Sequence, residues 1–203
     1  VPTTLDGTGY LLPEGGLREV QAPISGTVED LSLRDLGHVV AQTRVGGIRD
    51  SHGRLVAVLA PETGVVTETD TVRRAFVTAG QRLGLVQPVG WPLAIYAYVS
   101  TEVAADLEPG TPVRVRFGAG IGDSYGFATG RVQSVSRFPT TPERLGFILQ
   151  DASTIAAVRR LGPANEVVVA MDQSADTPSG LTWGTGDGPS GPLPAGLPAH
   201  VEF

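Results

Sequence analysis

The sequence predicts an all-β protein with a two-domain organisation, in which short strands are joined by tight turns. The chain holds 27 glycines and 16 prolines among 203 residues; helix interiors tolerate neither residue well, whereas turns between strands use both. Segments such as "TPVRVRFG" (111–118) alternate apolar and polar side chains, which is typical of a half-buried strand. A third observation is a repeat: "VQAPISGTVED" (20–30) returns as "VLAPETGVVTE" (58–68).

The repeat has a constant offset of 38 residues and a shared set of small, proline and β-branched positions. Those positions are Ala22, Pro23, Gly26 and Val28 in the first copy and Ala60, Pro61, Gly64 and Val66 in the second. Two copies are too few for a solenoid, which needs at least three. They fit two halves of one β-unit, 20–46 and 58–84, each of which covers the apolar face of the other. We therefore predict one domain over 19–85, with a pseudo-two-fold axis that makes the two glycine bends equivalent.

The connection between the two halves, "GGIRDSHGRL" (46–55), is rich in turn residues. We expect it to be short, exposed and outside the core. Its charged and polar residues form a candidate contact tip, made of Arg49, Asp50, Ser51 and His52.

The flanking segments are predicted to form a second β-domain from 86–203, joined by an N-terminal strand or linker over 1–18 in which residues 10–12 are a short strand. The elements expected in order are a strand at 93–99, a short helix capped by Ser100 or Thr101 and stopped by Pro109-Gly110, and strands at 111–118 and 125–138, with a flexible connection at 118–126 between them. An apolar segment, "LGFILQ" (145–150), follows without a predicted helix; then come a helix at 153–161, a strand at 166–172 and a Gly/Pro-rich tail that packs through Trp183.

Composition excludes several kinds of function. The net charge is −6, and every one of the 15 basic residues is Arg, so the clustered positive charge of a nucleic-acid surface is missing. The absence of cysteine excludes disulfides and thiol catalysis. His38, His52 and His200 do not have metal-ligand spacing, and no G-x-S-x-G nucleophile motif is present. The sequence therefore predicts no catalytic, metal or cofactor site.

The order of these motifs resembles a known family. The doubled A-P-x-x-G-x-V phrase followed by "PLAIYAYVSTEVAADLEPGTPVRVRF" (92–117) resembles the haemolysin-D-type membrane-fusion, or periplasmic adaptor, proteins. The stretches "YGFATGRVQSVSRFPTTPE" (125–143) and "PSGLTWGTGDGP" (178–189) are most similar to the secretion proteins of bacteriocin (leader-peptide microcin type) export systems. The long helical hairpin that most such adaptors insert between the halves is missing, because only 46–55 joins them here. No lysine exists to carry a lipoyl or biotinyl group by amide linkage.

The resemblance implies a lipoyl-like barrel-sandwich hybrid followed by a β-barrel adaptor domain. It implies a non-catalytic, extracytoplasmic scaffold, held to a membrane by an anchor outside this chain. The expected partners are an ABC transporter permease or a peptidase-containing transporter, further copies of the protein, and an exported peptide. Contacts between copies are expected to join Arg73, Arg74 and Arg82 to acidic residues of a neighbour, such as Glu29, Asp30, Glu68 or Asp70. Two alternatives stay open: a stand-alone β-rich binding or ring module, and a cell-wall peptidase that lacks its metal ligands.

Overall fold

The computed structural model describes residues 5–203, which divide into two compact units. Unit 1 combines 5–16 with 92–203, and unit 2 spans Leu17–Trp91. The chain therefore leaves unit 1 after Gly16, builds unit 2, and returns at Pro92. The sequence placed the corresponding boundaries at 19 and 85, and residues 1–4 of its N-terminal segment lie outside the described residues.

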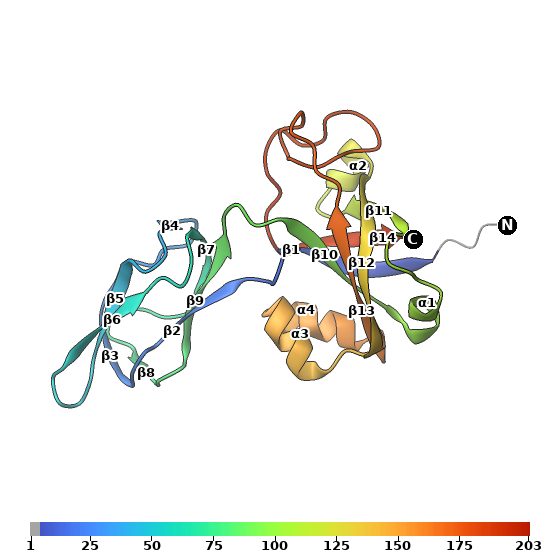
Figure 1. The fold of residues 1–203 in the computed structure, drawn as a ribbon. Coiled ribbons are helices and arrows are strands. Elements are labelled where there is room, and N and C mark those ends of the chain that lie inside the picture. The colour runs from blue at the N-terminus through green and yellow to red at the C-terminus, as the bar shows by residue number, and fades with distance from the viewer. Residues whose placement is uncertain (1–4) are drawn as a thin grey trace. The chain divides into compact units, whose positions relative to one another are not determined.

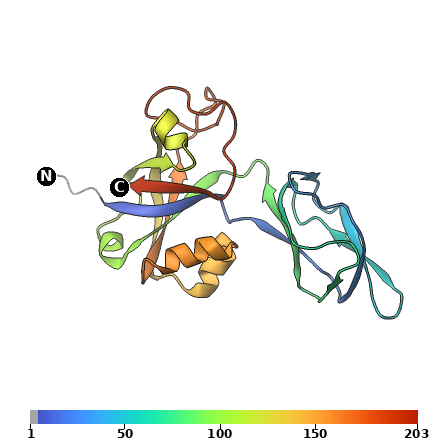
Figure 2. The same ribbon diagram turned by 180° about the vertical axis from the view of Figure 1, so that it is seen from behind.

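Unit 1 is a closed barrel with the strand order β1-β10-β13-β12-β11-β14 (Figures 1 and 2). Each neighbouring pair is antiparallel, and β14 closes the barrel by pairing with both β1 and β11. The bounds are β1 (Asp6–Pro13), β10 (Leu93–Ser100), β11 (Pro112–Phe117), β12 (Ala128–Pro139), β13 (Ala164–Met171) and β14 (Leu197–Glu202).

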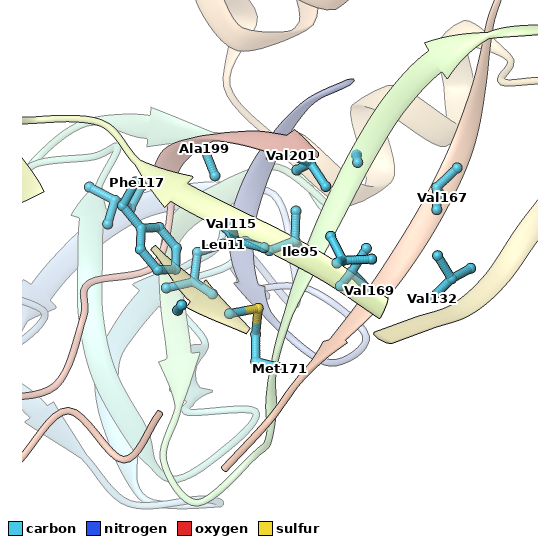
Figure 3. Close-up of a cluster of buried hydrophobic side chains, with 14 of the residues drawn as sticks. Leu11, Ile95, Val115, Phe117, Val132, Val167, Val169, Met171, Ala199 and Val201 are labelled. Carbon is cyan, nitrogen blue, oxygen red and sulfur yellow. The ribbon is translucent and has the colours of Figure 1, made fainter. Parts of the chain in front are cut away.

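Alternation along the strands builds the barrel core. In β11, Val113, Val115 and Phe117 are buried while Arg114 and Arg116 are exposed, which confirms the period-two prediction. The inward side chains of the other strands meet them in one cluster (Figure 3), which includes Leu11, Ile95, Val132, Val167, Val169, Met171, Ala199 and Val201. Closure leaves the barrel without free edges over most of its length, which is the usual reason for a β-sheet to close.

Four helices decorate the barrel within the described residues: α1 (Thr101–Ala105), α2 (Ile121–Tyr125), α3 (Pro142–Leu149) and α4 (Ala152–Arg159). The predicted helices at 101 and 153 are confirmed as α1, capped by the Ser100 side chain, and as α4. The sequence missed α2, in the segment expected to be a flexible connection. It also missed α3, because "LGFILQ" has no polar alternation while the capping signal, Thr141 followed by Pro142, lies upstream.

Unit 2 is built from a sheet of order β2-β9-β7-β4 and a sheet of order β6-β5-β3-β8. The first half supplies β2 (Arg18–Gln21), β3 (Gly26–Leu31), β4 (His38–Val39) and β5 (Arg44–Arg49), and the second supplies β6 (Leu55–Leu59), β7 (Gly64–Thr69), β8 (Phe76–Val77) and β9 (Arg82–Pro88). Adding 38 to β3 and β4 gives the bounds of β7 and β8, and each sheet contains strands from both halves. The two halves therefore interlock about a pseudo-two-fold axis, as the repeat predicted, and the predicted all-β fold class is confirmed.

The connection between the halves is shorter than the sequence suggested. β5 continues to Arg49 and β6 begins at Leu55, so the turn covers 50–54. The prediction that 46–55 lies outside the core was wrong for Gly46, Gly47 and Ile48, which are buried within β5. His38 lies in β4. Across 5–203, no helix has the length and apolar character needed to cross a membrane.

Candidate assembly surfaces

The repeated phrase occupies equivalent places in the two halves. The Ala22 amide donates to the Gln81 carbonyl at 2.9 Å, and the Ala60 amide donates to the Thr43 carbonyl at 2.9 Å. These bonds are related by the 38-residue offset, so each half closes its strand on the other half. Pro23 and Pro61 follow directly, in the bends that precede β3 and β7, where proline restricts the backbone.

Gly26 and Gly64 are required by close approach of neighbouring strands. A β-carbon at Gly26 would overlap the Arg49 carbonyl oxygen, and one at Gly64 would overlap the Gln87 carbonyl oxygen. Two residues further along each strand, Val28 and Val66 are buried in the core that both halves share. The motif positions therefore hold the unit together and expose no reactive group.

Several charged residues of unit 2 pair within the chain. Arg44 contacts Asp30 at 2.6 Å, and Arg82, the counterpart of Arg44 in the second half, contacts Asp70 at 2.6 Å. Arg49 contacts Glu29 at 3.0 Å. The side chain of Arg73 donates to the backbone carbonyl of Glu29, and Arg82 also lies 3.8 Å from Glu68. Arg73 and Arg82, which were expected to meet acidic residues of a neighbouring copy, therefore have partners within their own chain.

The candidate tip is an ordered turn. One Asp50 carboxylate oxygen accepts the amides of His52 and Arg54, each at 2.9 Å, and these bonds lower the pKa of Asp50 below its usual value. Arg49 donates to the Gly53 carbonyl at 2.9 Å. Ser51 and His52 are exposed at the end of the turn, and in Figure 1 the β5–β6 hairpin projects from its unit. Arg49 thus ends β5, Asp50 begins the turn and is half-buried, and Ser51 and His52 lie at its exposed end.

Unit 1 carries features that the sequence did not reveal. The outward tyrosines Tyr96 and Tyr98 are buried, and α3 and α4 lie together on this side of the barrel (Figures 1 and 2). Arg144 of α3 fastens the helices to the barrel through two contacts with the buried Glu166 carboxylate, at 2.7 and 3.2 Å. Burial, with the Glu166 charge, raises the pKa of Tyr98 above its usual value. Signals for this pairing are absent from local sequence because Arg144 and Glu166 are 22 residues apart.

The long loop at 172–196 packs against the barrel core through Leu181, Trp183 and Leu193. This agrees with the prediction that the Gly/Pro-rich tail packs through Trp183. Trp183 is 7% exposed, its indole nitrogen donates to the Ser179 hydroxyl at 2.9 Å, and its ring lies 5.9 Å from that of Phe117. Unit 1 also carries open grooves. One, of about 470 Å³, lies between α1 and the end of β12 and is lined in part by Asn165, and another, of about 500 Å³, runs along β11 beside Arg114.

Within residues 5–203, no set of three His, Asp or Glu side chains could hold a metal ion. Asn165 is already engaged, since it accepts from Thr101 and donates to the Ser136 carbonyl. The arrangement offers surfaces for contact with other molecules.

No protein-family model matches the chain, and no curated protein matches it in sequence. Solved structures match it in fold. ZneB from Cupriavidus metallidurans has a TM-score of 0.64 at 13% identity, covering 98% of this chain and 97% of that one. MacA from Actinobacillus actinomycetemcomitans has a TM-score of 0.66 at 10% identity, covering 100% and 78%. Spr0693 from Streptococcus pneumoniae R6, a membrane fusion protein, has a TM-score of 0.57 at 11% identity, covering 97% of each chain. The chain thus shares the fold of membrane fusion proteins.

Proposed function

We propose that this chain is the extracytoplasmic part of a membrane-fusion-type adaptor, which acts as a non-catalytic scaffold for a transporter. The observation that carries the proposal is the combination of an interlocked two-half unit with a closed barrel, in an arrangement of elements shared over nearly the whole length with a membrane fusion protein. Many polar side chains in both units already form hydrogen bonds or ion pairs within the chain, which favours a structural role over a catalytic one.

We further propose that the transporter is of the ABC type and exports a peptide, as the bacteriocin-system resemblance suggests. The unit over 19–85 would serve assembly between copies, and 1–18 with 86–203 would lie near the membrane and the permease. The exposed turn with Arg49, Asp50, Ser51 and His52 is a contact point for a neighbouring subunit. A membrane anchor and a peptidase-containing permease complete the proposed system.

Co-purification tests this function. The native gene is expressed together with a candidate ABC exporter, both are solubilised, and size exclusion with light scattering measures the mass of the complex. Co-elution in several copies, with loss of peptide export in a deletion strain, is the expected result. A protein that never binds the exporter, in cells that still export the peptide, supports the alternative of a stand-alone β-rich binding module.

A control variant sharpens the experiment. Replacing Ser51 and His52 together by glycine removes the two exposed polar side chains of the turn and leaves Arg49, Asp50 and the strands in place. If these residues contact a neighbour, the variant folds and loses mass in the complex. If its complex keeps the same mass, the turn plays no part in assembly, although the adaptor role stands.

A further inference from the structure

Two short edge strands of unit 2 each lie beside exposed apolar side chains. β4 and β8 end their sheets and are equivalent under the 38-residue offset, and Figure 1 shows them at opposite ends of the unit. Beside β4, Leu36 is 80% exposed and Val40 is 57% exposed. In and beside β8, Phe76 is 70% exposed and Val72 is 68% exposed. We call residues 34–40 with Glu62 the first surface, and residues 72–76 the second surface.

Leu36 shows that the needs of the fold alone do not explain the first surface. Its φ is 63°, in the left-handed region that a β-carbon disfavours. The bend is fixed by its amide, which donates to the Val66 carbonyl at 2.8 Å. Glycine or asparagine would adopt this bend at lower cost, and a polar side chain would be better solvated. An exposed leucine that is unfavourable on both counts indicates a contact outside its own chain.

The second surface carries two arginines. Arg74 occupies the bend equivalent to that of Leu36, with a φ of 71°, and Arg73 precedes it. Arg73 donates through Nε to the Glu29 carbonyl at 2.7 Å. Within residues 5–203 neither arginine forms an ion pair with a carboxylate. In this part of the chain the two positive charges beside Phe76 are therefore not neutralised by an ion pair.

The first surface carries the opposite net charge. Asp35 precedes the strained leucine, and Glu62 lies beside the end of β4, where the Ala41 amide donates to the Thr63 hydroxyl at 3.0 Å. Neither carboxylate forms an ion pair among residues 5–203. Arg34 belongs to the same surface, so its net charge is −1, whereas that of the second surface is +2.

These charges decide which surfaces can meet. If two copies met through their second surfaces, arginines would face arginines, and through their first surfaces carboxylates would face carboxylates, which is unfavourable. The first surface of one copy against the second surface of another brings opposite charges together around four exposed apolar side chains. Since one chain carries both surfaces, a second copy of the chain supplies the complement of each.

We propose that copies of this chain associate head to tail, with the first surface of one copy on the second surface of the next. Such a contact is heterologous, so each added copy leaves one surface of each kind free and the assembly grows into a ring or a filament. The inference builds on the proposed assembly role of 19–85 and does not depend on the transporter. Exposed ion pairs contribute little each, so the contact is weak in dilute solution and forms when copies are held close together.

Charge reversal at each surface provides the test. Arg73→Glu with Arg74→Glu reverses the second surface, and Asp35→Arg with Glu62→Arg reverses the first. The matched control is the other arginine doublet, at the C-terminal end of α4, changed by Arg159→Glu with Arg160→Glu. It alters the net charge as much as reversal of the second surface does. Circular dichroism checks that every variant folds, and sedimentation equilibrium at millimolar protein concentration and low salt measures association.

The unchanged protein and the control are expected to show a mass above that of the monomer, which falls when salt is added. Each reversal variant alone should associate at least about ten-fold more weakly, because like charges then meet in the contact. An equimolar mixture of the two reversal variants should regain association, since each surface again meets its opposite.

A monomeric unchanged protein under these conditions overturns the proposal, as does a mixture that associates no better than its components. If the two surfaces instead bind another protein, none of the purified samples associates, which also overturns it. The transporter role would stand in each case, because co-purification with the exporter tests it separately.

Discussion

Replacing Gly26 with alanine tests the close approach that interlocks the two halves of unit 2. The new β-carbon would lie 2.8 Å from the Arg49 carbonyl carbon and 3.0 Å from Ile48 Cγ2, where ordinary contacts begin at 3.4 Å. β3 is paired with β5 at this point, Thr27 opposite Arg49, so it cannot retreat without loosening the ladder. Overpacking and a weakened hydrogen bond together lower the free energy of unfolding by roughly 2–4 kcal/mol. In a unit of this size the melting temperature should fall by at least about 10 °C.

Differential scanning calorimetry measures the change, and hydrogen exchange of peptides from each unit shows where the structure opens. Gly64→Ala should have an equal effect, because its β-carbon would lie 2.9 Å from the Gln87 carbonyl carbon. Gly146→Ala is the control: it lies in α3 with nothing within 4 Å of the new atom, and should stabilise by up to about 1 kcal/mol. A change below about 0.5 kcal/mol for Gly26→Ala, the range of ordinary surface substitutions, would refute the reasoning.

Three further changes probe other parts of the molecule. Tyr98→Phe removes a buried hydroxyl that has no hydrogen-bond partner among residues 5–203. Urea titration should show that the free energy of unfolding rises by about 1–2 kcal/mol. A fall in that free energy would mean that the hydroxyl is hydrogen-bonded. The Asp151 carboxylate caps α4, and hydrogen bonds from its first turn lower its pKa from 3.8 to about 2. Its contribution is therefore present above pH 3.8 and lost as the pH falls towards 2, and Asp151→Asn should flatten that part of a pH–stability curve; an unchanged curve contradicts the assignment. Four Gly/Ser residues inserted between Ser51 and His52 should lower the free energy of unfolding by less than about 1 kcal/mol. The same insertion before Ile48 should unfold unit 2. Equal shifts in melting temperature for the two insertions would contradict the revised boundary of β5.

The architecture of unit 2 was predictable because the repeat carries its own register. Two segments with the same proline, glycine and valine positions make the same turns, and a constant offset of 38 residues fixes which strands are equivalent. Barrel strands in which apolar and polar side chains alternate, such as β11, were equally predictable. In both cases the signal lies in residues close together in the sequence.

The errors came from residues whose role depends on distant neighbours. Gly46 and Gly47 looked like turn residues, yet they lie in β5, where a β-carbon at Gly46 would stand 2.9 Å from the Asp30 carbonyl oxygen. A glycine demanded by a neighbouring strand looks the same in sequence as one demanded by a bend. The pairing of Arg144 with Glu166 was hidden for the same reason, since 22 residues separate the two in the sequence.

The way β14 closes the barrel governs the order in which the molecule can be completed during synthesis. β1 is made before unit 2, but one of its two partners, β10, follows only after the whole of unit 2, and the other, β14, spans Leu197–Glu202. Every strand of unit 2 lies within Leu17–Trp91. Unit 2 can therefore fold on the ribosome while β1 still has neither of its partner strands. Pairings between such remote segments form slowly. Until β14 emerges, the growing barrel exposes two unpaired edges, and this interval is when the nascent chain is most open to mispairing.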